Sequence, residues 1–453
     1  MEVAIVVVFV LGYLAIALEH PIHIDKAASA LLLGVICWAL FVLGVETVPH
    51  FLEHEYSLFQ DENPMLAANE VMPMFLEHRL LFHLSEIASI LFFLMGAMTI
   101  VETVDAHEGF RVITDRIKTT NKVKLLWILS ILTFFFSAVL DNLTTTIVMV
   151  SLLRKLIDDK KTRWFFVGFL VIAANAGGAW SPIGDVTTTM LWIKKQLPST
   201  PIIIKELLLP SLVTVIVPLI FLSFRMKGDV TRPVRRSSHE DENPASPKER
   251  TIIFILGVAG LLFVPVFKTV THLPPFMGMM LSLGVIWTVT EIMHRRKTME
   301  AKRQLNVLWV LRKIDSASVL FFLGILLGVS ALQEVGLLRE VAGWLDKTVG
   351  NIYAIDLTIG LLSAIVDNVP LVAAAQGMYP IAQEGVFAAS GDFWLFLAYC
   401  AGTGGSALII GSAAGVAAMG LERIDFIWYM KKLSLLAILG YLAGAGVFIL
   451  LSV

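Results

Sequence analysis

The chain has 453 residues, of which 57% are hydrophobic and only 16% are charged. Soluble globular domains typically carry about 25% charged residues, so this composition excludes a soluble globular protein. The 35 Lys and Arg nearly balance the 37 Asp and Glu, so the net charge points to no nucleic-acid partner. Apolar runs close to the roughly 20 residues that cross a hydrocarbon core recur along the chain. The sequence therefore predicts an all-α polytopic membrane protein whose surroundings are membrane lipid.

The long apolar runs are the expected membrane-spanning helices. In chain order they cover residues 3–18, 27–44, 84–104, 202–224, 251–268, 274–293, 315–333 and 426–452. The first run lacks a basic N-terminal region, since Glu2 is its only early charge, and we expect a retained helix rather than a signal peptide. Apart from Lys205, Lys268, Lys431 and Lys432, every Lys and Arg lies outside these runs. The segments where they crowd are interpreted as cytoplasmic, which predicts external N- and C-termini.

Five parts follow from this arrangement. Residues 1–104 are N-terminal spans, mostly scaffold, with an acidic external loop at 45–83. Residues 105–224 are a first repeat, with a hairpin at 124–157 and a broken helix at 164–197. Residues 225–250, which contain three prolines and dense mixed charge, are typical of a flexible cytoplasmic linker. Residues 251–333 are scaffold spans of the second half, and 334–453 are a second repeat with a hairpin at 352–385, a broken helix at 392–421 and the last span.

Two motifs recur at nearly one offset. SAVLDN (137–142) returns as SAIVDN (363–368), an offset of 226, and NAGGAWSPIGD (175–185) is matched by GTGGSALIIGS (402–412), an offset of 227. Apolar arms of about 15 residues around Asp141 reach only about 23 Å, which predicts a re-entrant hairpin. Basic residues flank the first hairpin, whereas Glu384 and Asp392 lie near the second, so we expect inverted orientations. Inverted repeats with broken helices are the architecture of secondary transporters.

Three aspartates in these motifs carry the predicted chemistry. A carboxylate at mid-bilayer costs about 2.5–3.5 kcal/mol even on the lenient insertion scale, so Asp141, Asp185 and Asp367 need a reason to be there. One alternative is helix capping, which is compatible with ion binding. Carboxylate, hydroxyl and amide oxygens are the ligands that a hard cation prefers. The expected ligands around the aspartates are Asn142, Thr144, Thr145, Asn175, Ser181, Thr187 and Thr188 in the first half, and Ser363, Asn368, Thr403, Ser406 and Ser412 in the second.

The two halves differ at one position, where Asp185 is matched by Ser412. We therefore place the principal ion site in the first half. Asp141, Asp185 and Asp367 are expected to take protons as well, because close carboxylates cannot all stay ionised without a cation. Glu86 is interpreted as a proton-access or proton-sensing group on the external side, with an ordinary interfacial glutamate as the alternative. We expect transported ions only, with no cofactor and no catalytic residue.

SAVLDNLTTT (137–146), NAGGAWSPIGDVTT (175–188), SAIVDNVP (363–370) and GTGGS (402–406) resemble the NhaD-type sodium/proton antiporters. These belong to the ion transporter superfamily, together with dicarboxylate/sodium symporters. The resemblance implies exchange of Na⁺ or Li⁺ for H⁺ by alternating access across a bacterial-type inner membrane. It also implies a homodimer with scaffold and transport domains. By motif, it assigns ion and proton roles to Asp141, Asn142, Asn175, Asp185, Thr187, Thr188, Asp367 and Asn368.

Two other functions remain as alternatives. A sodium-coupled anion or dicarboxylate symporter on the same scaffold would bring an anion against uncompensated aspartates, because the repeated motifs contain no Lys or Arg. An intramembrane aspartyl protease is more remote, because Asp185 follows Pro-Ile-Gly rather than the expected Gly-x-Gly. The sequence leaves the choice among sodium, lithium and potassium open.

Overall fold

The computed structural model describes residues 2–17, 19–44, 52–114, 117–233, 245–365 and 367–452. Within these ranges the regular structure is helical, with isolated bridges and no β-strand. Eight of the described helices are long and apolar enough to cross a membrane. The predicted all-α polytopic membrane protein is therefore confirmed. The chain divides into two compact units, which are described separately.

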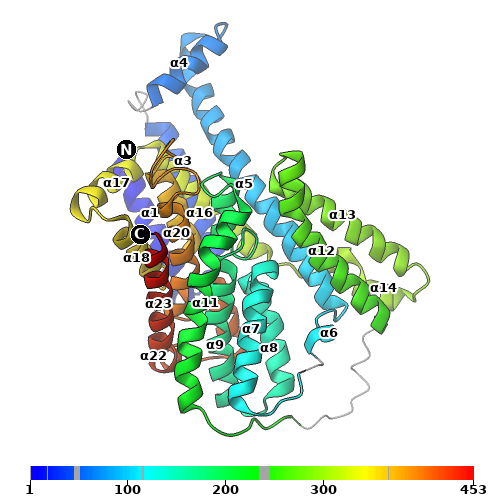
Figure 1. Cartoon of the computed structure of the whole chain (residues 1–453). Helices are drawn as coiled ribbons and strands as arrows, with labels where there is room; N and C mark the ends of the chain where they lie inside the picture. The colour runs from blue at the N-terminus through cyan, green and yellow to red at the C-terminus, as the bar shows by residue number, and fades with distance from the viewer. Residues whose placement is uncertain are drawn as a thin grey trace. The chain divides into compact units, whose positions relative to one another are not determined.

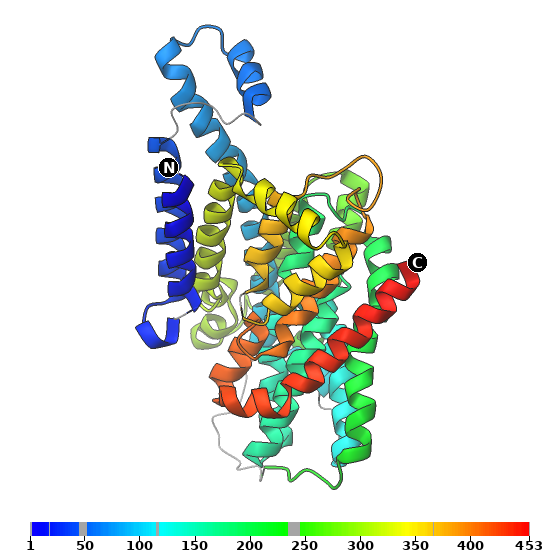
Figure 2. The same ribbon diagram turned by 90° about the vertical axis from the view of Figure 1, so that its left-hand side faces the viewer.

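The first compact unit comprises Met1–Leu91, Asp315–Asn351 and Val369–Ile381. Its helices are α1 (Glu2–Ala17), α2 (Glu19–Ile22), α3 (Lys26–Gly44), α4 (Glu53–Glu62), the first part of α5 (Ala68–Ala106), α16 (Ser316–Glu334), α17 (Leu337–Thr348) and most of α19 (Asn368–Met378). Figure 2 shows α1 and α3, in blue, beside the yellow-green α16. A Cβ added to Gly34 of α3 would strike the carbonyl of Gly324 on α16. These two helices therefore pack backbone to backbone, as small residues allow in membranes.

Helix α5 begins at Ala68, well before the apolar run at 84–104 that predicted it. Residues 45–83 are expected from the sequence to be an external loop. In the described part of this segment, most residues belong to α4 or α5. The earlier turns of α5 are polar, so hydropathy alone does not find them. The early turns of α5 are anchored by the buried carboxylate of Glu334. Arg79 donates to this carboxylate through Nε at 3.0 Å and Nη2 at 2.6 Å, and His83 Nε2 lies 2.7 Å from Glu334 Oε1.

The second compact unit comprises Phe92–Ile314, Ile352–Asn368 and Ala382–Val453. After the end of α5, it contains α6 (Arg111–Thr114), α7 (Lys122–Leu140), α8 (Asn142–Leu156), α9 (Lys160–Ala179), α10 (Val186–Ile193), α11 (Thr200–Arg225), α12 (Pro247–Thr271), α13 (Pro275–Met293), α14 (Met299–Leu305), α15 (Val307–Val310), α18 (Ile352–Leu362), α20 (Asp392–Gly404), the 3₁₀ turn η2 (Gly405–Ala407), α21 (Ala413–Glu422), α22 (Phe426–Lys432) and α23 (Ser434–Ser452). In Figure 1, α7, α8 and α9 lie side by side, and the red α23 runs along the green α11. The division into scaffold and transport parts stays a prediction.

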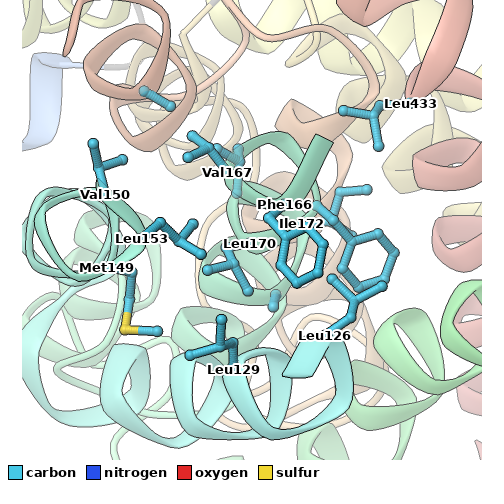
Figure 3. Close-up of a cluster of buried hydrophobic side chains, with 14 of the residues drawn as sticks. Leu126, Leu129, Met149, Val150, Leu153, Phe166, Val167, Leu170, Ile172 and Leu433 are labelled. Carbon is cyan, nitrogen blue, oxygen red and sulfur yellow. The ribbon is translucent and has the colours of Figure 1, made fainter. Parts of the chain in front are cut away.

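A single apolar cluster holds α7, α8 and α9 together. Figure 3 shows Leu129 of α7, Met149 and Leu153 of α8, and Phe166 and Leu170 of α9 converging on one another. All five side chains are at most 1% exposed. In lipid, such side chains stabilise the helix contacts through van der Waals packing rather than through removal of apolar surface from water. This cluster fixes the three helices whose ends carry the predicted ion ligands.

Helix α7 has 19 residues, about 28 Å, so it is longer than the arm of about 15 residues expected before Asp141. Its length alone permits a crossing, and the re-entrant path of α7 and α8 stays a prediction. The last predicted span, 426–452, is divided into α22 and α23.

Two histidines stack just beyond the ends of α5 and α13. His107 and His294 have ring centroids 5.0 Å apart, and their Nε2 atoms are separated by 3.2 Å. His107 Nδ1 lies 2.7 Å from the Thr103 carbonyl, so Nδ1 donates there and His107 Nε2 accepts from His294. Burial lowers the pKa of His107, and burial together with the neighbouring His107 lowers the pKa of His294 to about 4. The pair is therefore neutral near pH 7.

Candidate ion-binding site

A single residue, Asp141, separates helix α7 from helix α8. Its backbone has φ 74° and ψ 163°, a region that normally only glycine occupies and that costs about 1–3 kcal/mol. The Asp141 carboxylate caps α8, accepting from Thr144 N at 2.8 Å and Thr144 Oγ1 at 2.9 Å. A strained, non-glycine residue at a helix break is typical of a functional position.

A second break separates α9 from α10 and ends at Asp185. This residue is 1% exposed and caps α10, accepting from Thr187 N at 2.9 Å and Thr187 Oγ1 at 2.7 Å through Oδ1. Its other oxygen accepts from Asn142 Nδ2 at 2.8 Å. The two breaks are thus joined by a direct hydrogen bond from Asn142, the first residue of α8, to Asp185.

Asn175 links this pair to the second half of the chain. Its Oδ1 accepts from Asn142 Nδ2 at 3.1 Å, while its own Nδ2 donates to Ser406 Oγ and Ser412 Oγ, both at 2.9 Å. All of these side chains are buried. A continuous chain of polar groups therefore runs from Asp185 through two amides to the break between α20 and α21.

The electrostatics of this chain are unbalanced. Asp141 and Asp367 both lie close enough to interact electrostatically with Asp185. In the described part of the chain, the side-chain and backbone donors to Asp141 and Asp185 are neutral hydroxyl, amide and N–H groups. Asp185 is buried, whereas Asp141 and Asp367 are half-buried, and an ionised carboxylate buried without a counter-charge is strongly unfavourable. The geometry therefore suits neutralisation by a cation or by protons.

The remaining residues of the second half lie around the end of α18 and the break after α20. Ser363 Oγ donates to Gly360 O at 2.7 Å, and Thr403 Oγ1 donates to Tyr399 O at 2.6 Å. Asn368 is buried, with Nδ2 3.4 Å from Ala401 O, and Asp367 is half-buried. Ser412 caps α21 by accepting from Gly415 N at 3.1 Å.

The glycines of the two breaks make matching contacts. A Cβ added to Gly184 would lie 2.7 Å from Ser137 O, and one added to Gly411 would lie 2.6 Å from Ser363 O. Similarly, a Cβ on Gly177 would strike the backbone of Phe134, and one on Gly404 would strike the backbone of Gly360. The two matching glycines in each case are 227 residues apart, and the two residues that they contact are 226 apart. These are the offsets of the sequence motifs. Only glycine fits at these four backbone approaches.

The other predicted ligands take different positions. Thr145 is fully buried, and its hydroxyl has no hydrogen-bond partner among the described residues. Thr188 Oγ1 lies 3.4 Å from Ala179 O, and Ser181 Oγ accepts from Ile183 N at 3.4 Å. Glu86 belongs to the first compact unit, where it interacts electrostatically with Arg79. The capping role considered for the aspartates is present at Asp141 and Asp185.

Sequence reasoning missed three buried acids. Glu334 lies at the end of α16, and Glu422 at the end of α21 accepts from Arg154 Nε at 2.6 Å and Arg163 Nε at 2.8 Å. Asp356 lies in the middle of α18 and is fully buried. The available signal was an isolated acid inside or next to an apolar run.

Comparison with known proteins agrees with this chemistry. Residues 2–390 match the family described as citrate transporter, CitMHS. The chain is 44% identical to sodium/proton antiporter 1 of Arabidopsis thaliana, over 99% of this chain and 72% of the relative, and 43% identical to sodium/proton antiporter 2 of that plant, over 96% of each. It is also 29% identical to the Na⁺/H⁺ antiporter NhaD of Vibrio cholerae serotype O1, over 99% of this chain and 91% of the relative. The chain therefore belongs to the CitMHS family of membrane transporters, and over most of its length it is similar in sequence to proteins named sodium/proton antiporters.

Proposed function

We propose that this chain exchanges Na⁺, or Li⁺, for H⁺ across the membrane, with Asp141 and Asp185 at the centre of the ion site. The observation that carries the proposal is the environment of Asp185. Its carboxylate is 1% exposed, accepts only from neutral donors in the described residues, and lies close to two further aspartates. The names of its relatives, sodium/proton antiporters in a plant and in bacteria, support the same reaction.

Competition for one set of oxygens is sufficient for exchange. A sodium ion placed among Asp141, Asp185 and the neighbouring hydroxyl and amide oxygens neutralises the pocket, and protons on the carboxylates do the same. The empty, charged pocket is costly to carry through a low-dielectric barrier. Alternating access then moves only the loaded forms, and the two ions cross in opposite directions without a separate coupling element.

Calorimetry tests this competition directly. Sodium is titrated into the purified protein in buffers of different protonation enthalpy, between about pH 6 and about pH 9. Sodium binding should release protons, and the apparent affinity for sodium should strengthen as pH rises and then level off once the pocket holds no proton. Sodium binding without proton release at any pH in this range would refute the proposal.

Sodium-coupled symport of citrate or another carboxylate is the second candidate, since the family carries the description of citrate transporter. An anion needs a positive pocket, yet among the described residues no Lys or Arg donates to the chain of Asp141, Asn142, Asn175 and Asp185. Citrate that accelerates sodium uptake in proteoliposomes would favour symport. Sodium uptake driven by an outward proton gradient alone would favour exchange.

We propose further that the two helix breaks belong to inverted repeats with re-entrant hairpins. The matching glycine contacts, at the same offsets of 226 and 227 as the motifs, support equivalent units. Cysteines placed at Lys124 and Glu384 should be labelled from opposite faces of the membrane, and labelling from one face would contradict the inversion. The homodimer, the bacterial-type inner membrane and the external termini are part of the same proposal, and cross-linking in membranes tests the dimer.

A further inference from the structure

Helix α18 carries a carboxylate that the ion site does not use. Asp356 lies within the apolar sequence IYAIDLTIGLL and has 0% exposure. Neither of its oxygens accepts a hydrogen bond from any described residue. Asp185 is buried to the same degree but accepts from three donors. Asp356 therefore differs from Asp185 in that its buried carboxylate accepts no hydrogen bond from the described residues.

The described titratable groups that interact with Asp356 are a thiol and a phenol, with no basic side chain among them. Gly360, one turn later on α18, lies against the Cys400 carbonyl of α20 and the Tyr441 hydroxyl of α23. Asp356 interacts electrostatically with the Cys400 thiol and with Tyr441. The Tyr441 hydroxyl donates to Leu357 O at 3.0 Å. The nearby Tyr399 hydroxyl donates to Tyr441 O at 2.7 Å, so both phenols are already committed to backbone carbonyls.

An ionised carboxylate is not tolerated in these surroundings. Moving an unpaired carboxylate from water into a protein interior costs several kcal/mol even after relaxation, and such a group becomes neutral instead. A hard cation cannot supply the neutral state, because it is held by several oxygen ligands at once and no described polar group lies within hydrogen-bond distance of the Asp356 oxygens. Asp356 therefore holds a proton.

The position of Asp356 makes this proton distinct from those of the ion site. Asp356 lies on α18, whereas Asp367 follows the end of that helix at Leu362. Its counterpart at the offset of 226 is Ser130 of α7, which is also buried and whose hydroxyl has no partner among the described residues. A serine fills the same kind of position in the first half at a much lower desolvation cost. An aspartate is retained here although it accepts no hydrogen bond from the described part of the fold.

We propose that Asp356 is an additional proton-binding residue of the exchange cycle, which carries one proton in the conformation described here and releases it to water in another. The step is an ionisation: the carboxyl O–H bond breaks, the proton passes to water, and the electron pair stays on the carboxylate, which is then hydrated. The proposal rests on the proposed antiport function, because alternating access supplies the second, hydrated conformation. It adds one proton per cycle to those displaced at Asp141 and Asp185.

The ratio of protons to sodium tests the proposal. Full-length protein in proteoliposomes is given a fixed sodium gradient, and the pH gradient that stops net sodium flux is measured. Asp356→Asn, which keeps the size of the side chain and cannot ionise, should require a larger pH gradient, corresponding to one proton fewer per cycle. Asp356→Ser, which copies the first half, should behave in the same way. Asp425→Asn, on the exposed cap of α22, is the matched control and should leave the ratio unchanged.

An unchanged ratio in active Asp356→Asn or Asp356→Ser protein would overturn the inference. If neither variant transports, infrared difference spectra decide instead. One carboxylic-acid carbonyl band should be present in the original protein, change when sodium is added, and be missing from the spectrum of Asp356→Asn, whereas bands from Asp141 and Asp185 remain. A band that is insensitive to both sodium and pH, or that persists in the variant, would also overturn it. Absence of proton-coupled sodium flux in the unaltered protein would instead refute the proposed function.

Discussion

Asp185 and Ser412 occupy matching positions in the two halves, so replacing each of them separates the charge of the ion site from its hydrogen bonds. In Asp185→Asn, the new amide would point an NH₂ group at Asn142 Nδ2. If the side-chain amides of Asn142 and Asn175 both flip, the conflict is removed. The Asn142 oxygen then accepts from the new amide and from Asn175 Nδ2, and the Asn175 oxygen accepts from the hydroxyls of Ser406 and Ser412, which can donate. The loss of stability should be about 1 kcal/mol, the net value of one hydrogen bond.

Ser412→Ala costs a similar amount for a different reason. It removes the N-cap of α21, worth about 1 kcal/mol, while Asn175 keeps its bond to Ser406. The two variants are therefore matched in stability and differ in charge. Removing the carboxylate that faces the cation should cost about 3–5 kcal/mol of ion binding, a hundredfold or more in affinity. Removing the Ser412 hydroxyl should weaken sodium affinity only several-fold.

Sodium flux driven by a pH gradient in proteoliposomes is the assay, with thermal unfolding of each variant as the control. Asp185→Asn should fall to the flux of empty vesicles while keeping its melting temperature within a few degrees. Ser412→Ala should retain most of the flux at saturating sodium. Equal losses of flux at equal stability and expression would show that the site is not centred on the first half.

Three further predictions concern residues that are not themselves proposed ion ligands. Glu422→Gln leaves two arginines facing a neutral group and should lower the free energy of unfolding by about 1–3 kcal/mol. Asp425→Asn is its exposed control, and equal melting temperatures would count against the ion pairs. Gly177→Ala should disrupt folding because its Cβ meets backbone, whereas Gly446→Ala, with nothing within 4 Å, should not; equal stability of the two would contradict the close approach. For His294, whose pKa is lowered from 6.5 to about 4, the unfolded chain takes up a proton before the folded protein does. Stability should therefore fall as pH drops from about 6.5 to about 4, by about 3 kcal/mol in total, and His294→Gln should flatten that slope in thermal unfolding at varied pH. An equally steep slope in the variant would argue against the pair.

The aspartates of the proposed ion site stand out in the sequence because each is an isolated acid in an apolar, repeated motif. Their hydrogen bonds could not. Asn142 and Asp185 are 43 residues apart, and Asn175 and Ser406 are 231 apart. Such contacts depend on how helices pack, whereas periodicity and hydropathy report only on local structure. The offset of 226 indicated that the motifs correspond to each other without showing that Asn175 reaches across to the second half.

The buried acids outside the motifs were missed for physical reasons. The partners of Glu334, Arg79 and His83, lie on turns of α5 that are too polar for a hydropathy scale to assign to a helix. Their burial depends on one carboxylate that lies far along the chain, 255 residues after Arg79. Asp356 lies in an arm whose repeated motif begins only at Ser363, so comparing the two halves did not draw attention to it.

The backbone conformation at Asp141 has a consequence for how this protein is engineered or evolves. A glycine would adopt φ 74°, ψ 163° without penalty, whereas aspartate pays about 1–3 kcal/mol there. Substitution by glycine relieves that strain but also removes the α8 cap and the carboxylate. Where the relief of strain exceeds the loss of the cap, about 1 kcal/mol, selection for a more heat-resistant protein without selection for transport would favour losing the residue that is proposed to bind the ion. In such an experiment, the variants that gain stability at this break would mark the ion site without any measurement of flux, because stability and activity are in conflict at this residue.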